Sequence, residues 1–134
     1  MRVLLLSLIT FLFLAPLALG DPKIPAEAPN ITPTELAARQ TSGDAPVVID
    51  VRTAAEFATG HIPGALNIPF DQVADRISEV QAPNGVALYC MMGPRARKGE
   101  SALLSAGYTS VLHIDGGLSA WKAAGLPVEM KKTE

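Results

Sequence analysis

Short apolar runs that alternate with helix-forming segments constrain the fold more than any other feature of this 134-residue chain. Strands are expected at residues 45–51, 86–90 and 110–114, with a shorter one near residues 65–67. The first of these runs is rich in β-branched residues and apolar on both faces, as in a buried parallel strand. Because helical segments separate the strands, the sequence predicts an α/β fold with a mostly parallel sheet flanked by helices on both faces.

Two threonines mark the expected starts of helices. Thr32 is followed three residues on by Glu35, and Thr53 is followed in the same way by Glu56. This spacing is typical of a capping box, in which the two side chains bond to each other's backbone N–H groups. Gly43 is expected just beyond the end of the first helix. Further helices are expected over residues 71–80, 96–106 and 118–124.

The two ends of the chain differ in composition from the middle. Residues 1–20 have a positive start, a long apolar stretch and small residues at the end, which is the pattern of a secretory signal peptide. Residues 21–30 contain three prolines and are predicted to be a Pro-rich leader. A single domain is predicted for residues 31–130 and a polar tail for residues 131–134.

The signal peptide predicts secretion across the inner membrane into the bacterial periplasm, without stable membrane association after cleavage. An uncleaved signal that serves as an anchor is the alternative. The chain has 11 basic and 13 acidic residues, a net charge of −2, and loses one positive charge if Arg2 leaves with the signal. A mildly acidic protein lacks the basic surface that nucleic acid requires, so we expect no nucleic-acid partner.

The chain contains a single cysteine, Cys90, at the end of a predicted strand. Exported proteins usually pair their cysteines in disulfides, and one cysteine cannot form an internal disulfide. Cys90 is therefore buried and inert, paired with another molecule, or reactive. In parallel α/β sheets the ligand site lies beyond the carboxyl ends of the strands, where Cys90 is expected together with Asp50 and Arg52.

The loop after Cys90 can form a cup for an anion. Its residues are Met91, Met92, Gly93, Pro94, Arg95 and Ala96. The backbone N–H groups of the loop, the start of the next helix and the Arg95 side chain all favour the thiolate, the nucleophilic form. Pro94 contributes no N–H, and the two methionines suggest a partly apolar rim. We therefore expect an ionised and exposed sulfur that can attack an anionic substrate.

Other kinds of site find little support. The two histidines, His61 and His113, do not combine with the single cysteine into a metal-binding pattern, so we expect no metal ion and no cofactor. A Cys–His dyad would need a histidine that faces Cys90, whereas His113 is expected in a strand and His61 in a turn. The chain has no glycine pattern typical of a nucleotide-binding loop.

Two stretches resemble the signatures of the rhodanese (thiosulfate sulfurtransferase) family, specifically its small single-domain exported kind. Residues 50–70, DVRTAAEFATGHIPGALNIPF, are similar to the family's Asp-x-Arg…Glu-Phe…Gly-His-Ile-Pro-Gly-Ala-x-Asn-Ile-Pro pattern. Residues 89–96, YCMMGPRA, resemble its Cys-x-x-Gly-x-Arg active loop. The segment 107–128, which contains Trp121, is similar to the family's closing segment. Together the similarities cover nearly all of residues 32–128.

The resemblance implies a rhodanese-like fold with a five-stranded parallel sheet and sulfur chemistry at Cys90. Cys90 would attack the outer sulfur of thiosulfate or a related anionic donor, carry it as a persulfide and pass it to cyanide or a thiol. The backbone amides of residues 91–95 would cradle the persulfide, and Arg95 would hold the leaving group or orient the loop. Asp50 and Arg52 would form an ion pair that braces the end of their strand.

Two alternatives remain open at this point. A cysteine-dependent phosphatase or arsenate reductase would have five residues between its cysteine and arginine, whereas four separate Cys90 from Arg95. The shorter loop makes a smaller cup, and Tyr89 stands where a phosphatase usually has histidine. The second alternative is a rhodanese-like binding module without catalytic activity, although such modules typically replace the cysteine.

Overall fold

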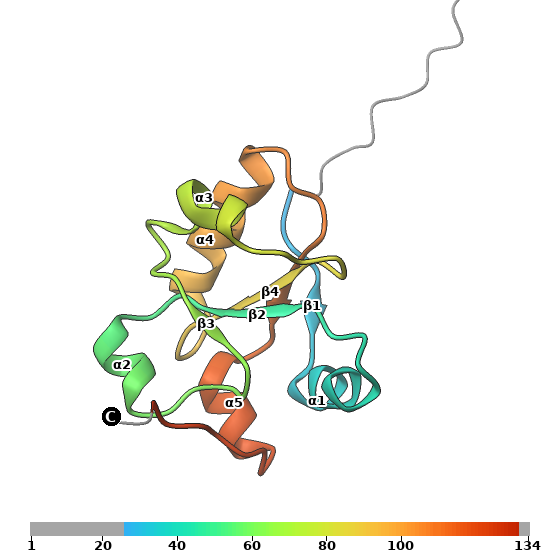
Figure 1. Ribbon diagram of the computed structural model, residues 1–134, viewed down its shortest axis with the longest axis vertical. Coiled ribbons are helices and arrows are strands. Elements are labelled where there is room, and N and C mark those ends of the chain that lie inside the picture. The colour runs from blue at the N-terminus through green and yellow to red at the C-terminus, as the bar shows by residue number, and fades with distance from the viewer. Residues whose placement is uncertain (1–25, 132–134) are drawn as a thin grey trace, which may run out of the picture.

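The computed structural model describes residues 26–131, which form a five-stranded parallel sheet with helices on both faces (Figure 1). The strand order is β1-β5-β4-β2-β3. The strands are β1 (Asn30–Ile31), β2 (Val47–Asp50), β3 (Leu66–Asn67), β4 (Val86–Tyr89) and β5 (Val111–Ile114). The helices are α1 (Pro33–Ser42), α2 (Ala54–Ala58), α3 (Val73–Arg76), the 3₁₀ turn η1 (Ile77–Glu79), α4 (Pro94–Ser105) and α5 (Gly117–Ala123). The predicted fold class is confirmed.

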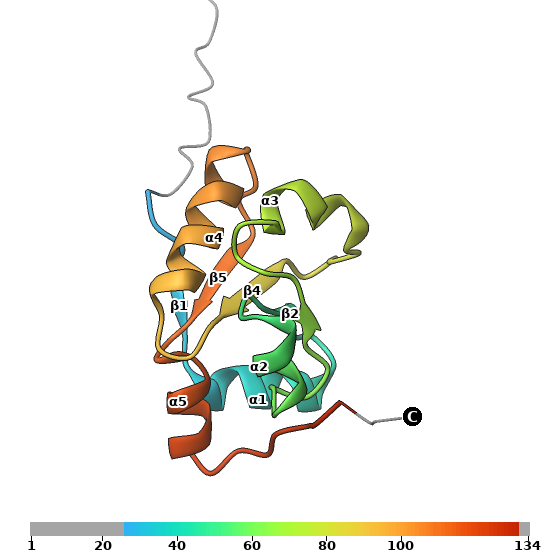
Figure 2. The ribbon, with the colours of Figure 1, turned by 90° about the vertical axis from the view of Figure 1, so that its left-hand side faces the viewer.

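Helices lie on both sides of the strands in Figure 2, and an apolar core fills each side of the sheet. Neighbouring residues of a strand point to opposite faces, so Leu88 of β4 belongs to one core and Tyr89 to the other. The first core includes Leu103 of α4 and residues of α3 and η1. The second includes Leu36 of α1 and Trp121 of α5, both at most 1% exposed. The sheet is therefore covered on both sides, as its continuous apolar strands require.

Both predicted capping boxes are present. The Thr32 hydroxyl accepts from the Glu35 N–H at 3.2 Å, and the Glu35 carboxylate accepts from the Thr32 N–H at 2.9 Å. Thr53 and Glu56 form the same reciprocal pair at the start of α2. Gly43 ends α1 in the left-handed conformation that glycine adopts without strain. The sequence pattern thus predicted these local starts and stops because their partners lie three residues apart.

The short strand β1 differs from the sequence prediction, which placed the boundary between leader and domain after Asn30. Asn30 pairs with His113 of β5, and the His113 N–H donates to the carbonyl of Pro29 at 2.8 Å. Ala28 is buried in the first core. Residues 28–30 therefore belong to the folded domain. The predicted signal peptide, residues 21–25 of the leader and the last residues of the predicted tail lie outside the described residues.

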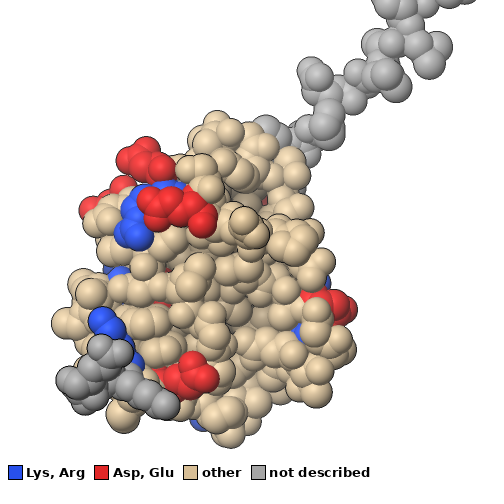
Figure 3. Space-filling model, in the orientation of Figure 1, with Lys and Arg blue, Asp and Glu red and all other residues tan. Residues whose placement is uncertain are grey.

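Charged side chains form mixed groups on the face seen in Figure 3. Basic and acidic side chains lie beside one another around α3, where Arg76 and Glu79 pair at 3.4 Å, and most of this face is uncharged. Within residues 26–131, none of the helices combines the length and the apolar composition that crossing a bilayer would require.

Candidate active site

Cys90 directly follows β4 and precedes α4, in the loop that runs beside the start of α5 (Figure 2). The N–H groups of Leu118 and Ser119 donate to the carbonyl oxygens of Cys90 and Met91 at 2.9 and 3.0 Å. Gly117 permits this approach because a Cβ there would lie 2.6 Å from the Cys90 oxygen. The start of α5 therefore holds two loop carbonyls through its own N–H groups.

One backbone N–H group bonds to the sulfur of Cys90. The Gly93 N–H donates to Sγ at 3.1 Å. Gly93 has φ +150° and ψ −40°, a backbone conformation that residues other than glycine rarely adopt. Within residues 26–131, four further N–H groups of the loop have no acceptor, namely those of Met91, Met92, Arg95 and Ala96. Together with the start of the twelve-residue helix α4, these donors provide an environment for a negative charge.

The expectation of an exposed sulfur is wrong for this structure, because Cys90 is only 1% exposed. It packs in the first core together with Leu88 and Ala96. The sequence reasoning missed this because apolar residues on both sides of a thiol do not reveal how closely they cover it. Met91 and Met92 are the accessible residues of the loop, 37% and 71% exposed. A substrate can therefore reach the sulfur only after a local movement of the loop or of the side chains around it.

Arg95 does not point freely into solvent but is bound by Glu56 of α2. Two guanidinium nitrogens donate to the two carboxylate oxygens at 2.8 and 3.0 Å. The hydrogen bond to Arg95 lowers the pKa of Glu56 to about 2, against the smaller opposing effect of burial. The pKa of Arg95 is raised, chiefly by the same hydrogen bond and in part by the charges of Cys90 and Asp50. Arg95 therefore lies within electrostatic reach of Cys90.

Asp50 and Arg52 form the predicted ion pair at the end of β2. Arg52 Nη2 donates to Asp50 Oδ2 at 2.6 Å, and both residues are at most 2% exposed. The Tyr89 hydroxyl also donates to Asp50 Oδ2 at 2.6 Å and accepts from the Ile62 N–H. Burial, followed by the hydrogen bond to Asp50, raises the pKa of Tyr89 far above its usual range. The pair thus holds Tyr89, the residue before Cys90. Tyr89 belongs to the second core, whereas Cys90 belongs to the first, on the other face of the sheet.

A buried Glu–His pair lies behind the loop and was missed by the sequence analysis. His113 Nδ1 and Glu100 Oε1 are 2.6 Å apart, and Arg97 Nη1 lies 3.4 Å from the other oxygen of Glu100. A Cβ on Gly93 would lie 3.7 Å from the His113 ring, so this ring packs against the loop. The pair joins α4 to β5 across 13 positions, so no local pattern could reveal it. His61, which was expected in a turn, forms a β-bridge with Glu129, and its Nδ1 lies 2.9 Å from the Phe57 carbonyl oxygen.

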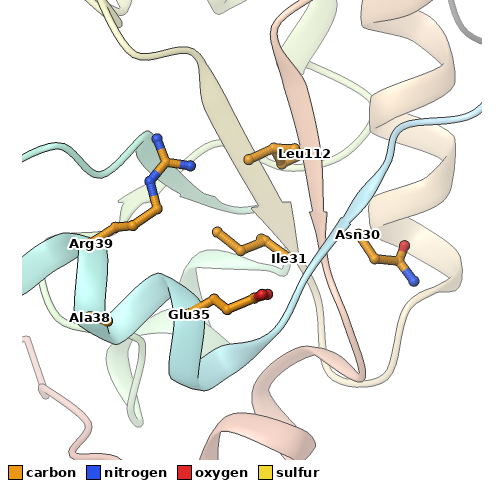
Figure 4. A pocket seen from close by; sticks show the side chains of 6 residues that line it. All are labelled: Asn30, Ile31, Glu35, Ala38, Arg39 and Leu112. Carbon is orange, nitrogen blue, oxygen red and sulfur yellow. The ribbon is translucent and has the colours of Figure 1, made fainter.

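A hollow of about 430 Å³ lies away from the cysteine loop, between α1 and the strands β1 and β5 (Figure 4). Its lining residues are Asn30, Ile31, Glu35, Ala38, Arg39 and Leu112. Its size alone does not make it the functional site, because it brings together no nucleophile and no general acid–base pair. We place the candidate site at Cys90 on chemical grounds.

Fold and site define the chain as a parallel α/β domain with one cysteine in a strand-to-helix loop. The sequence model of the rhodanese-like domain family matches residues 32–124. The chain therefore belongs to this family, as the sequence resemblance predicted. A sulfurtransferase of Allochromatium vinosum is 39% identical over 82 residues, which cover 61% of this chain and 77% of that protein. The thiosulfate sulfurtransferase GlpE of Pseudomonas putida is 32% identical over 68% of this chain and 83% of that protein.

The solved structures agree on the fold. The solution structure of the rhodanese-like domain of the Anabaena protein Alr3790 matches with a TM-score of 0.69 at 31% identity, over 78% of this chain and 83% of that one. Other curated relatives are longer proteins, and the chain spans 44% and 50% of the length of two of them. The comparisons support sulfur transfer in general and an enzyme of the rhodanese family.

Proposed function

We propose that the protein transfers sulfane sulfur from a small donor to a thiophilic acceptor through a persulfide on Cys90. The single observation that carries the proposal is the hydrogen bond from the Gly93 N–H to the Cys90 sulfur at the start of α4. A backbone N–H group at the sulfur and the start of a helix beside it are features that suit a nucleophilic cysteine. The sulfurtransferase relatives support the same chemistry.

The transfer proceeds in two displacement steps that balance in atoms and electrons. The Cys90 thiolate attacks the outer sulfur of the donor, the donor's S–S bond breaks, and the leaving group departs with the electron pair. With thiosulfate the leaving group is sulfite. The acceptor, cyanide or a thiolate, then attacks the terminal sulfur of the persulfide and restores the Cys90 thiolate. In this proposal the N–H groups of Met91, Met92 and Arg95 would bind the terminal sulfur, while Pro94 has no N–H to contribute.

The local movement that access to Cys90 requires also fits this chemistry. A persulfide adds one sulfur atom beyond Sγ, so the loop must make room for it next to residues of the first core. Shielding from water protects the persulfide from side reactions between the two steps. We further propose that this reaction takes place in the periplasm, where residues 1–20 would direct the chain.

Formation of thiocyanate from a sulfane sulfur donor and cyanide tests the proposal. We expect turnover by the wild-type protein and none by Cys90→Ser, whose hydroxyl keeps the hydrogen bond to Gly93 but is a weak nucleophile. Equal turnover by both proteins, or none by the wild type, would reject sulfur transfer at Cys90. Hydrolysis of an aryl phosphate that is abolished by Cys90→Ser would instead support the phosphatase alternative. A phosphatase would need Arg95 to bind the phosphate, whereas both carboxylate oxygens of Glu56 accept hydrogen bonds from the Arg95 guanidinium. This pairing favours sulfur transfer over the phosphatase alternative.

A further inference from the structure

The two arginines predicted for the site, Arg52 and Arg95, are each paired with a carboxylate. Arg52 is paired with Asp50 at 2.6 Å, and Arg95 is paired with Glu56 through two hydrogen bonds. An incoming anion would therefore find backbone N–H groups at the loop but no uncompensated side-chain cation from these two residues. This charge balance differs from a site built to bind a dianion, where arginine side chains remain free to form bidentate contacts.

Glu56 is fixed in place by its own helix. It occupies the third position of α2, and its Oε1 accepts hydrogen bonds from the N–H and the hydroxyl of Thr53 as well as from Arg95. The Glu56 and Arg95 side chains are about one-third exposed, so the pair lies at the surface rather than in the core. Because the pKa of Glu56 is lowered to about 2, its carboxylate stays ionised at neutral pH. The negative charge beside Arg95 is therefore a permanent feature of the resting protein.

The accessible part of the loop is apolar. Met91 and Met92 are 37% and 71% exposed, although methionine is usually buried. Unbranched, polarisable side chains of this kind adapt to apolar groups of different shapes. A donor that carries a hydrocarbon group would bury it against these two residues, whereas thiosulfate has no such group.

On the basis of the sulfur transfer proposed above, we propose that Glu56 is a specificity-determining residue that disfavours thiosulfate. The donor class that fits is an organic sulfane-sulfur compound with a single negative charge and an apolar substituent, such as an alkyl persulfide or a thiosulfonate. Glu56 cancels the attraction that the Arg95 charge would exert on each unit of donor charge, and it withholds Arg95 from the leaving group. The methionine rim binds the substituent.

Two donors that differ in charge test this assignment. Thiosulfate is a dianion and benzenethiosulfonate a monoanion, and in both the outer sulfur is attacked, with sulfite or benzenesulfinate as the leaving group. We would measure kcat/KM for each donor with cyanide as acceptor, in the wild type and in Glu56→Gln. Glutamine keeps the length of the side chain and its capping oxygen but removes the charge. The ratio of kcat/KM between Glu56→Gln and the wild type is taken for each donor separately, so the different intrinsic reactivities of the two donors cancel.

We expect Glu56→Gln to raise kcat/KM by about threefold per unit of donor charge, hence about threefold for benzenethiosulfonate and about tenfold for thiosulfate. Glu79→Gln is the matched control, because Glu79 also pairs with an arginine but lies on η1. It should change neither value. Met92→Ser should lower kcat/KM for benzenethiosulfonate more than for thiosulfate, because only benzenethiosulfonate has an apolar group to bury against this side chain.

The outcomes separate this inference from the proposed function. If neither donor supports turnover in any variant, sulfur transfer itself fails. If both donors are used but Glu56→Gln changes them equally, or lowers the use of thiosulfate, the role of Glu56 in specificity is overturned while sulfur transfer stands. Thermal denaturation of each variant shows whether α2 remains folded, and Met92→Ser, which alters no helix cap, tests the apolar rim independently.

Discussion

Substitution of Asp50 by alanine is expected to destabilise the protein more than any change of a surface charge. Asp50 is fully buried and accepts hydrogen bonds from the Arg52 backbone N–H, the Arg52 guanidinium and the Tyr89 hydroxyl. In Asp50→Ala, the buried guanidinium keeps the Gly60 carbonyl as acceptor but loses its counter-ion. The Tyr89 hydroxyl loses the acceptor for its proton. Both groups then remain buried at the end of the strands that lead to the candidate site.

The expected loss is about 3–5 kcal/mol of unfolding free energy, the cost of removing one partner of a buried ion pair. This is a large part of the roughly 5–15 kcal/mol that stabilises a domain. With a urea dependence of about 2 kcal/mol per molar, the midpoint of unfolding should fall by about 2 M. Equilibrium unfolding in urea, followed by circular dichroism, measures the shift.

Two further variants make the reasoning refutable. Asp71→Ala removes an exposed carboxylate and should shift the midpoint little. The double substitution Asp50→Leu and Arg52→Leu removes both charges and should be less destabilised than Asp50→Ala, because no buried charge remains unpaired. A loss below about 1 kcal/mol in Asp50→Ala, or a double variant that is less stable than Asp50→Ala, would contradict this account of the pair.

Three more substitutions or conditions probe the loop and its supports. Gly117→Ala should lower the unfolding free energy by about 3 kcal/mol or more and abolish sulfur transfer, because the new Cβ would lie 2.6 Å from the Cys90 carbonyl oxygen. Gly43 is the control, since it has a similar φ but no atom within 4 Å of the position that a Cβ would take. Gly43→Ala should lower the unfolding free energy by only about 1 kcal/mol and leave sulfur transfer intact. Glu100→Ala should lower the unfolding free energy by about 1–3 kcal/mol, because buried His113 loses its hydrogen-bond partner. The stability that Glu56 gains from Arg95 is present above about pH 4.5 and is lost as the pH falls towards about 2, so urea unfolding should show that the wild type loses about 1 kcal/mol more than Glu56→Gln in this range.

The results that would contradict these expectations are specific. Gly117→Ala and Gly43→Ala with equal stability and equal transfer activity would mean that the contact between α5 and the loop is unimportant. A Glu100→Ala protein as stable as the wild type would show that His113 needs no acidic partner. Parallel loss of stability in the wild type and Glu56→Gln on acidification would show that Arg95 does not lower the pKa of Glu56.

The parts of the fold that could be predicted from the sequence are those determined by residues close together in the chain. The capping boxes of α1 and α2 have partners three positions apart, and the central strands are recognisable as apolar runs. Strand β1 could not be found in this way, because its two residues follow three prolines and acquire strand structure only by pairing with β5. The family resemblance implied a fifth strand but did not place it.

The position of the candidate site in the fold could be predicted from the sequence, but the contacts between its side chains could not. The position of Cys90 after a strand and the loop that follows it were predictable from local patterns, and the Asp50–Arg52 pair from the family resemblance. The partner of Arg95 lies 39 positions away, on the helix whose start Glu56 also caps, so the sequence did not reveal that the two charges neutralise each other. The burial of Cys90 likewise depends on how Ala96 and other residues of the first core pack around it.

The most direct test of the central claim is the mass of the peptide that contains Cys90 after the full chain has been incubated with a sulfane sulfur donor. Benzenethiosulfonate and thiosulfate should be used in parallel, followed by removal of the donor and digestion without reductant. The account predicts a gain of one sulfur atom on Cys90, which cyanide removes as thiocyanate. An unchanged mass with both donors, under conditions in which a small alkylating reagent modifies Cys90, would contradict the claim that this thiol carries sulfur.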